Sequence, residues 1–203
     1  MGAPINNEWG FRFGAVARMR DGIMEDINTG EDYNEIDKQA YRGQLFWDPS
    51  DQLSIRAIGY YSNTQGSTGI TDNHFDSGTS NPAQLGHLGT LQAIASMIPG
   101  TGAIDTDDAN YKASVNVVDD TQLEVNGGSV QVDFELANGV TFTSISSFQK
   151  WDLAGFDSDV DGTPLDLVET NRQTIDESVG QEFRLTSAGG EAIDWVAGLY
   201  YFN

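Results

Sequence analysis

Residues 40–61 read AYRGQLFWDPSDQLSIRAIGYY, in which apolar and polar side chains alternate on both sides of residues 48–51. A period of two places successive side chains on opposite faces of a β-sheet. The proline in the link DPSD is typical of a turn, because its fixed φ starts one and it has no N–H for a ladder. The stretch therefore predicts a β-hairpin with one apolar face and a second face that carries Arg42 and Arg56.

The composition limits the classes of partner. The chain has 203 residues, no cysteine and a formal net charge of −21. So strong a negative charge argues against nucleic acid, because phosphate binding needs a basic surface. No run approaches the ~18 apolar residues of a spanning helix, and the first residues lack the basic and apolar regions of a signal peptide. Barrel strands carry a weaker, alternating signal, so a membrane remains compatible with the sequence.

The alternation recurs along the chain and predicts an all-β fold, an antiparallel meander of about seven strands. The Asn-Gly pair at 138–139 between two such runs is a strong hairpin signal. In the long polar stretch that interrupts the strands, leucines and isoleucines at near-helical spacing predict one short helix at about 82–98. The predicted strands cover residues 9–18, 40–47, 53–61, 128–136, 140–151, 177–185 and 192–202.

The links between the predicted strands differ strongly in length. Those at Pro49, Asn138 and Gly189 are tight, and the three links that alternate with them are long and acidic. All tight turns therefore fall at one end of the sheet, as in outer-membrane barrels with short periplasmic turns and long extracellular loops. A sandwich would have loops of more even length at both ends. The long links cover residues 20–37, 63–126 and 152–176.

Large aromatic residues lie near both ends of the predicted strands, as in the two aromatic belts of a membrane barrel. Trp9, Trp47 and Trp195 are at the tight-turn end, and the loop end has Trp151, Tyr61 and Tyr201.

Charged side chains project from the face opposite to the apolar one. A closed core would not hold them, because burying a charge costs several kcal/mol unless it is paired. The lumen of a barrel, filled with water or with a plug domain, can accommodate these charges. We therefore predict that these residues face the lumen of a transmembrane β-barrel, where contacts with a plug are favoured over contacts with an anionic ligand. The predicted lumen-facing residues are Arg12, Arg18, Arg42, Arg56, Asp133, Glu135, Glu182 and Arg184.

Several of these segments resemble the barrel of TonB-dependent receptors. Residues 178–190 (SVGQEFRLTSAGG) and 193–202 (IDWVAGLYYF) carry the resemblance, together with 41–56 (YRGQLFWDPSDQLSIR) and 18–22 (RMRDG). The similarity covers all three hairpins and the first strand and is poor over 64–125, and no ligand motif of the family can be matched to a residue.

The resemblance implies that residues 1–203 are an internal piece of the receptor barrel, with the plug domain and the remaining strands absent. Such receptors have a barrel of about 22 strands in the outer membrane of Gram-negative bacteria. They take up ferric siderophores, cobalamin, nickel complexes or glycans with energy relayed by TonB. The implied partners are outer-membrane lipid, the plug domain, the TonB complex and a small-molecule ligand such as an iron chelate. Two alternatives stay open: a passive porin-like barrel and a soluble β-sandwich that binds carbohydrate.

One acidic stretch begins like a calcium-binding EF-hand loop. Asp157, Asp159 and Asp161 alternate before a glycine. Val168 then occupies the twelfth position, where that loop needs a glutamate, so a solvated acidic turn is favoured over a metal site.

Catalytic motifs are not evident in the sequence. His74 and His87 have no partner at metal-ligand spacing and belong to no nucleophile motif. We therefore predict that the protein is not an enzyme and needs no cofactor.

Overall fold

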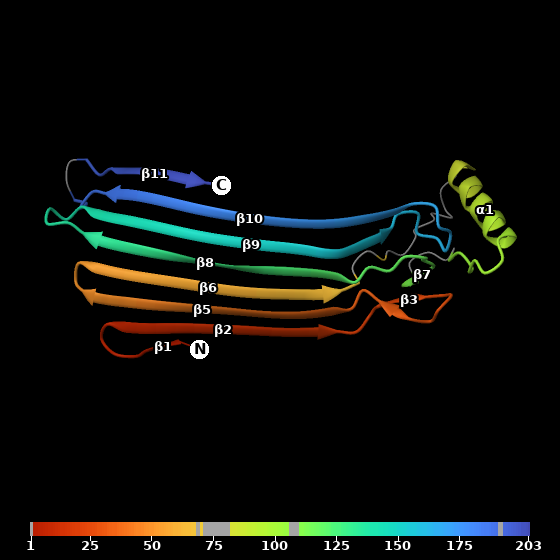
Figure 1. The fold of residues 1–203 in the computed structure, drawn as a ribbon, viewed down its shortest axis with the longest axis horizontal. Coiled ribbons are helices and arrows are strands. Elements are labelled where there is room, and N and C mark those ends of the chain that lie inside the picture. Colours follow the sequence, from red (N-terminus) through yellow and green to blue (C-terminus); the bar gives the residue numbers. More distant parts are fainter. Residues whose placement is uncertain (1, 68–69, 71–81, 106–109, 191–192) are drawn as a thin grey trace.

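A single antiparallel sheet dominates the computed structural model, which describes residues 2–67, 70, 82–105, 110–190 and 193–203 (Figure 1). The sheet has eight strands in the order β1-β2-β5-β6-β8-β9-β10-β11, and each strand pairs with its neighbour in that order (Figure 1). The predicted all-β meander is confirmed. The strands are Gly2–Pro4 (β1), Trp9–Arg20 (β2), Ile36–Ser50 (β5), Leu53–Gly66 (β6), Thr121–Glu135 (β8), Thr141–Asp159 (β9), Glu169–Thr186 (β10) and Val196–Phe202 (β11).

The register keeps the two predicted faces separate across the sheet. Phe11 pairs with Leu45, Leu45 with Ala57, and Ala57 with Val130. Because paired residues point to the same side, these form part of one apolar face. We call the opposite side, which carries Arg12 and the residues in register with it, the polar face.

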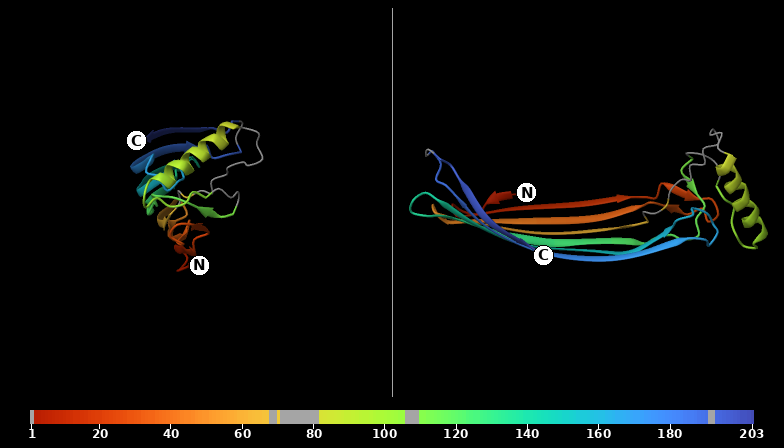
Figure 2. Two further views of the ribbon diagram at one scale, coloured as in Figure 1. Left: turned by 90° about the vertical axis from the view of Figure 1, so that its right-hand side faces the viewer. Right: turned by 90° about the horizontal axis from the view of Figure 1, so that it is seen from above.

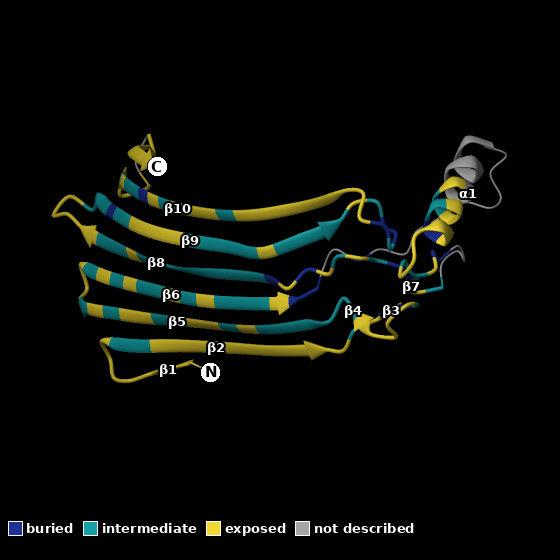
Figure 3. Ribbon diagram, turned by 45° about the vertical axis from the view of Figure 1, so that its right-hand side comes forward, coloured by how far each residue is buried: buried dark blue, intermediate teal, exposed yellow. Residues whose placement is uncertain are grey.

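No second layer covers the apolar face within the described part of the chain, and edge views show a single twisted sheet (Figure 2). Phe13, Val130 and Phe148 on that face are 48%, 45% and 44% exposed. The buried hydrophobic side chains lie instead beyond the sheet, where most of the dark-blue segments of Figure 3 gather. They are Met24, Ile70, Ala95, Ile104, Ala113 and Leu165.

The predicted difference between the two ends of the sheet is confirmed (Figure 1). The links β1–β2, β5–β6, β8–β9 and β10–β11 lie at one end, the tight-turn end. There Gly139 has a φ of 77°, and its N–H donates to the carbonyl of Leu136 at 2.9 Å. The other three links lie at the opposite end, the long-loop end.

The strands are longer than predicted toward the long loops. Residues 152–176 were predicted as a loop, and this is wrong, because β9 continues to Asp159 and β10 starts at Glu169. In this extension the apolar face becomes polar: Glu124 pairs with Asp152. The apolar side chains lie on the opposite side of the ladder there, because Leu123 pairs with Leu153. A prediction that follows one apolar face therefore ends the strand too early.

Two further corrections concern the tight-turn end. The prediction missed β1, a three-residue strand that pairs with residues 10–12 of β2. In the hairpin of β5 and β6, β5 extends through Pro49 to Ser50, with a register shift between Trp47 and Ser50. A proline is tolerated at such a bulge because the ladder is already interrupted.

The aromatic pattern holds in part. Trp9 and Trp47 stack at the tight-turn end with ring centroids 4.9 Å apart. Trp151 does not belong to an outward belt, because it pairs with Val125 and Asp176 on the polar face.

The long-loop end carries a small folded unit, which we call the loop cap. Its three-stranded sheet has the order β4-β3-β7, with β3 at Met24–Asp26, β4 at Asp32–Tyr33 and β7 at Lys112–Ala113. The predicted helix is α1, Pro82–Met97, and Leu91, Ile94 and Ala95 pack with Ile104 and Leu165. Among the residues described, no helix has the length and hydropathy needed to cross a bilayer.

Candidate functional site

The register brings all the predicted lumen-facing residues to one side of the sheet, the polar face. Arg12 pairs with Gln44, Gly14 with Arg42, and Phe46 with Arg56. On the following strands the polar face carries the rest of the set, Asp133, Glu135, Glu182 and Arg184, and on β2 it also carries Arg18.

A chain of hydrogen bonds crosses this face from β6 to β9. Arg56 Nη2 donates to Gln131 Oε1 at 2.6 Å, and Gln131 Nε2 donates to Asp133 Oδ2 at 2.7 Å. Thr143 Oγ1 donates to the other carboxylate oxygen of Asp133 at 2.6 Å. Asp133 therefore accepts from Gln131 of its own strand and from Thr143 of β9, and the polar groups of this part of the face are fixed in place.

The charges on the polar face are segregated. On the polar face of β2, of β5 as far as Phe46 and of β6, every charged side chain is a cation, and we call this region the basic zone. Arg20 and Lys38 belong to it and were not predicted, although continuing the alternation of their strands would have identified them. The basic zone consists of Arg12, Arg18, Arg20, Lys38, Arg42 and Arg56.

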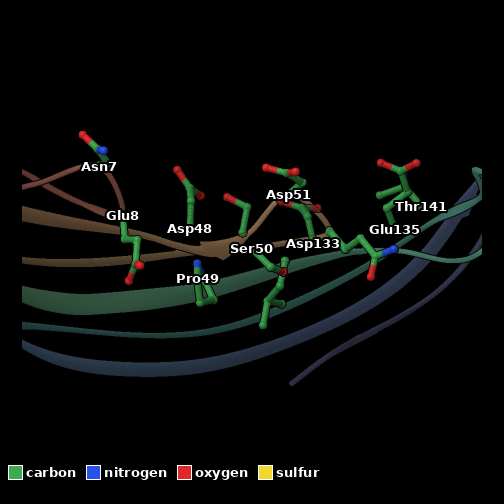
Figure 4. Close-up of a pocket in the computed structure, with 12 residues that line it drawn as sticks. Asn7, Glu8, Asp48, Pro49, Ser50, Asp51, Asp133, Glu135 and Thr141 are labelled. Atoms are coloured by element: carbon green, nitrogen blue, oxygen red, sulfur yellow. The ribbon is translucent and has the colours of Figure 1, made fainter.

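Carboxylates gather at the tight-turn end of the same face. They line an open hollow of about 550 Å³ and stand on the turns and strand ends that surround it (Figure 4). Asn7, Ser50 and Thr141 add uncharged polar groups (Figure 4). The polar face therefore has an acidic rim beside its basic zone. The carboxylates of the rim belong to Glu8, Asp48, Asp51, Asp133 and Glu135.

A buried aspartate joins two long loops of the loop cap. Asp26 is 1% exposed, and its Oδ1 accepts the backbone N–H groups of Asn28 and Thr29 at 2.8 Å each. Its Oδ2 accepts the backbone N–H of Val115, 89 positions along the chain, at 3.0 Å. The link between β2 and β5 is thereby fixed to the link between β6 and β8. The sequence gives no signal for this contact, because nothing local distinguishes Asp26 from the acids around it.

A second carboxylate makes a similar connection. Glu35 accepts the backbone N–H of Ser67 at 3.0 Å and the Ser67 hydroxyl at 2.5 Å. Burial alone would raise the pKa of the Glu35 carboxyl, but the hydrogen bonds from Ser67 outweigh burial and hold the pKa below its ordinary value.

The lowered pKa of Glu35 predicts a pH-dependent loop cap. A carboxyl whose pKa is lowered by folding contributes stability at neutral pH, and this contribution is lost as the pH falls through its folded pKa. We expect acidification below the ordinary glutamate pKa to loosen the contact with Ser67. In Ser67→Ala the pKa of Glu35 should rise, measured by titrating its side-chain carbon signal by NMR. An unchanged pKa in Ser67→Ala would contradict this account.

The three weak metal candidates already accept hydrogen bonds, and Asp159 also accepts the backbone N–H of Asn116, from the link between β6 and β8, at 3.3 Å. Asp157 accepts a hydrogen bond from the Asn171 side chain, and Asp161 accepts the Val168 N–H at 3.0 Å. Asp159 accepts the Gly162 N–H at 2.8 Å, and burial raises the pKa of its carboxyl above the ordinary value.

Other groups of metal-ligating side chains give no further candidate. In the part of the chain that the structure describes, no three histidine, cysteine, aspartate or glutamate residues are arranged to hold a metal ion. His74 lies outside the described residues, and for His87 the description extends to the backbone of α1.

Comparison with known proteins gives one informative match. No protein-family profile and no curated protein sequence matches the chain. Among solved structures, the ferric yersiniabactin uptake receptor FyuA from Yersinia pestis matches with a TM-score of 0.67 at 15% sequence identity. The match covers 99% of this chain. The chain has the fold of a β-barrel fragment. It spans 27% of the receptor, about a quarter of its length, and the fold class predicted from the alternation is confirmed.

Proposed function

We propose that this chain is part of the barrel wall of an outer-membrane receptor that takes up a small nutrient, such as an iron chelate, by TonB-dependent active transport. One observation carries the proposal: the sheet exposes its apolar face, while the buried hydrophobic side chains of the described residues lie in the loop cap. The fold match to an uptake receptor supports it.

Hydrocarbon is the environment that suits such a face. From Trp47 to Tyr41 the apolar side of β5 extends about 20 Å at about 3.4 Å per residue. This is close to the apolar band of roughly 25 Å on membrane barrels. In lipid the backbone groups of an open sheet edge must also be paired, so β1 and β11 would adjoin further strands of a closed barrel.

The polar face then lines the lumen, and the residues predicted to face it are wall residues. Charges are acceptable there, because water or a plug domain solvates them. The tight-turn end would be periplasmic and the loop cap extracellular. In this role the chain forms a wall and takes no part in catalysis.

Fractionation of cells that express the full-length protein tests the location. We expect the protein in the outer membrane, with a gel mobility that changes on heating, because folded barrels resist detergent until heated. A monodisperse protein in the soluble fraction without detergent would contradict the proposal and favour a carbohydrate-binding module.

An uptake assay separates active transport from a passive porin. In a deletion strain complemented with the gene, we expect accumulation of radiolabelled iron chelate to stop when a protonophore collapses the proton gradient. Uptake that persists without the gradient would favour a porin-like barrel.

A further inference from the structure

A small hollow lies within the basic zone, between β2 and β5. It has a volume of about 350 Å³ and is lined by Arg12, Gly14, Arg42 and Gln44. The register pairs Arg12 with Gln44 and Gly14 with Arg42, so the two arginines stand diagonally across the pair of strands. Gly14 leaves open space between them, since a Cβ atom placed there would meet no atom within 4 Å.

Gln44 holds one of the two guanidinium groups in place. With its amide oxygen turned toward Arg42, Gln44 accepts hydrogen bonds from Arg42 Nε and Nη2 at 3.1 Å each. In this orientation the amide NH₂ remains available as a further donor. The hollow thus combines two cations, an amide and an open floor.

Neither arginine is neutralised within the described residues. The ion pairs found there involve Lys112, Lys150 and Arg184, and no described carboxylate pairs with Arg12 or Arg42. Both side chains are exposed, and their nearest charged neighbours on β2, β5 and β6 are other cations. In a chain with a net charge of −21, an uncompensated group of cations needs a local reason.

We propose that the hollow between Arg12 and Arg42 is a binding site for an oxyanion group, a carboxylate or phosphate. Guanidinium groups form forked, charge-assisted hydrogen bonds with planar oxyanions, and two of them can hold one group from two sides. The open floor at Gly14 admits the part of the molecule that carries the anion. This inference rests on the proposed function for its position on a lumen wall, and on the local geometry for its chemistry.

The oxyanion can come from two sources: a small solute in the lumen, or a carboxylate side chain from another part of the full-length protein. The recognition chemistry is the same in both cases. Chemical modification of arginine distinguishes them, because a bound oxyanion shields the guanidinium from reagent.

The experiment uses detergent-purified full-length protein treated with phenylglyoxal, with modification of each arginine followed by peptide mass spectrometry. Arg172, an exposed arginine of β10, is the internal reference. The probes are inorganic phosphate and tricarballylate, and glycerol is the uncharged control. For a solute site, we expect tricarballylate to slow modification of Arg12 and Arg42 by about fivefold or more and that of Arg172 by less than about twofold.

For an internal carboxylate, Arg12 and Arg42 should react slowly without added anion and faster at high sodium chloride, which screens the ion pair. Equal reactivity of all three arginines with and without anions would overturn the proposal. If modification of Arg12 and Arg42 were slow and neither salt nor anion changed its rate, the arginines would be sterically shielded by other parts of the protein. This result would also overturn the proposal.

Substitution adds a second readout. In Arg42→Gln, the concentration of tricarballylate or salt needed to change Arg12 reactivity by half should shift by about tenfold, because one guanidinium partner is lost. The matched Arg172→Gln should leave this concentration unchanged. If Arg42→Gln also left it unchanged, the proposed site would be contradicted. These readouts do not depend on uptake. A negative uptake assay would therefore not contradict the anion site, and a negative result for the anion site would not contradict transport.

Discussion

In the proposed membrane location, replacing Val130 by arginine is expected to destabilise the protein by about 2–4 kcal/mol. Val130 lies on the apolar face in register with Ala57 and Ser146, near the middle of the apolar stretch. At that depth the guanidinium would have to leave water for hydrocarbon, a cost that falls toward the interfaces. Unfolding of the full-length protein by guanidinium chloride in phospholipid vesicles, followed by tryptophan fluorescence, measures the change in the free energy of unfolding.

The adjacent residue supplies the control. Ser129 belongs to the same strand and points to the polar face, where it pairs with Ile58 and Ser147. Ser129→Arg introduces the same side chain one position away, and we expect a loss below about 1 kcal/mol because the charge stays in a polar lumen. If Ser129→Arg cost as much as Val130→Arg, the two faces would not differ in environment and the membrane proposal would fail.

Replacing Asp26 by alanine is expected to open the loop cap. The carboxylate accepts backbone N–H groups from both loops that it joins, and the half-buried Val115 N–H would lose its partner. Losing charge-assisted bonds and leaving a half-buried donor unpaired costs on the order of 3 kcal/mol. Hydrogen exchange measured by mass spectrometry should show faster exchange at Asn28, Thr29 and Val115, with the strands of the large sheet unchanged.

Asp32→Ala is the matched control for that experiment. Asp32 is an exposed acid of β4 in the same loop cap, and its backbone pairs with Glu25. The substitution removes the same charge with little loss of structure, so we expect exchange close to that of the unmodified protein. Equal loosening by Asp32→Ala would mean that net charge, rather than the contacts of Asp26, holds the loop cap together.

The sequence predicted the sheet and its two faces because alternation is a local property of a strand. In the hairpin of β5 and β6, the alternation within each strand sets its apolar and polar sides. Pairing of the two strands then brings Arg42 and Arg56 to one face without further information. The helix was also predictable, since Pro82 marks its first turn and its apolar spacing is local.

The parts that were missed depend on contacts distant in sequence. At the ends of β8 and β9 the two faces exchange character, because Glu124 pairs with Asp152 on one side and Leu123 with Leu153 on the other. The contact between Asp26 and Val115 joins segments 89 positions apart, and no pattern around either residue announces it. The hollow at Gly14 likewise exists because β2 pairs with β5 in one particular register.

By itself, the sequence determined that this chain forms a meander with an apolar side and a charged side, because side-chain direction in a strand follows from position alone. The tertiary structure decided how far the strands extend, that the long loops close into one unit with its own buried residues, and which cations have no carboxylate partner among the described residues. Those features arise from pairing and burial between distant segments, and a linear pattern does not encode them.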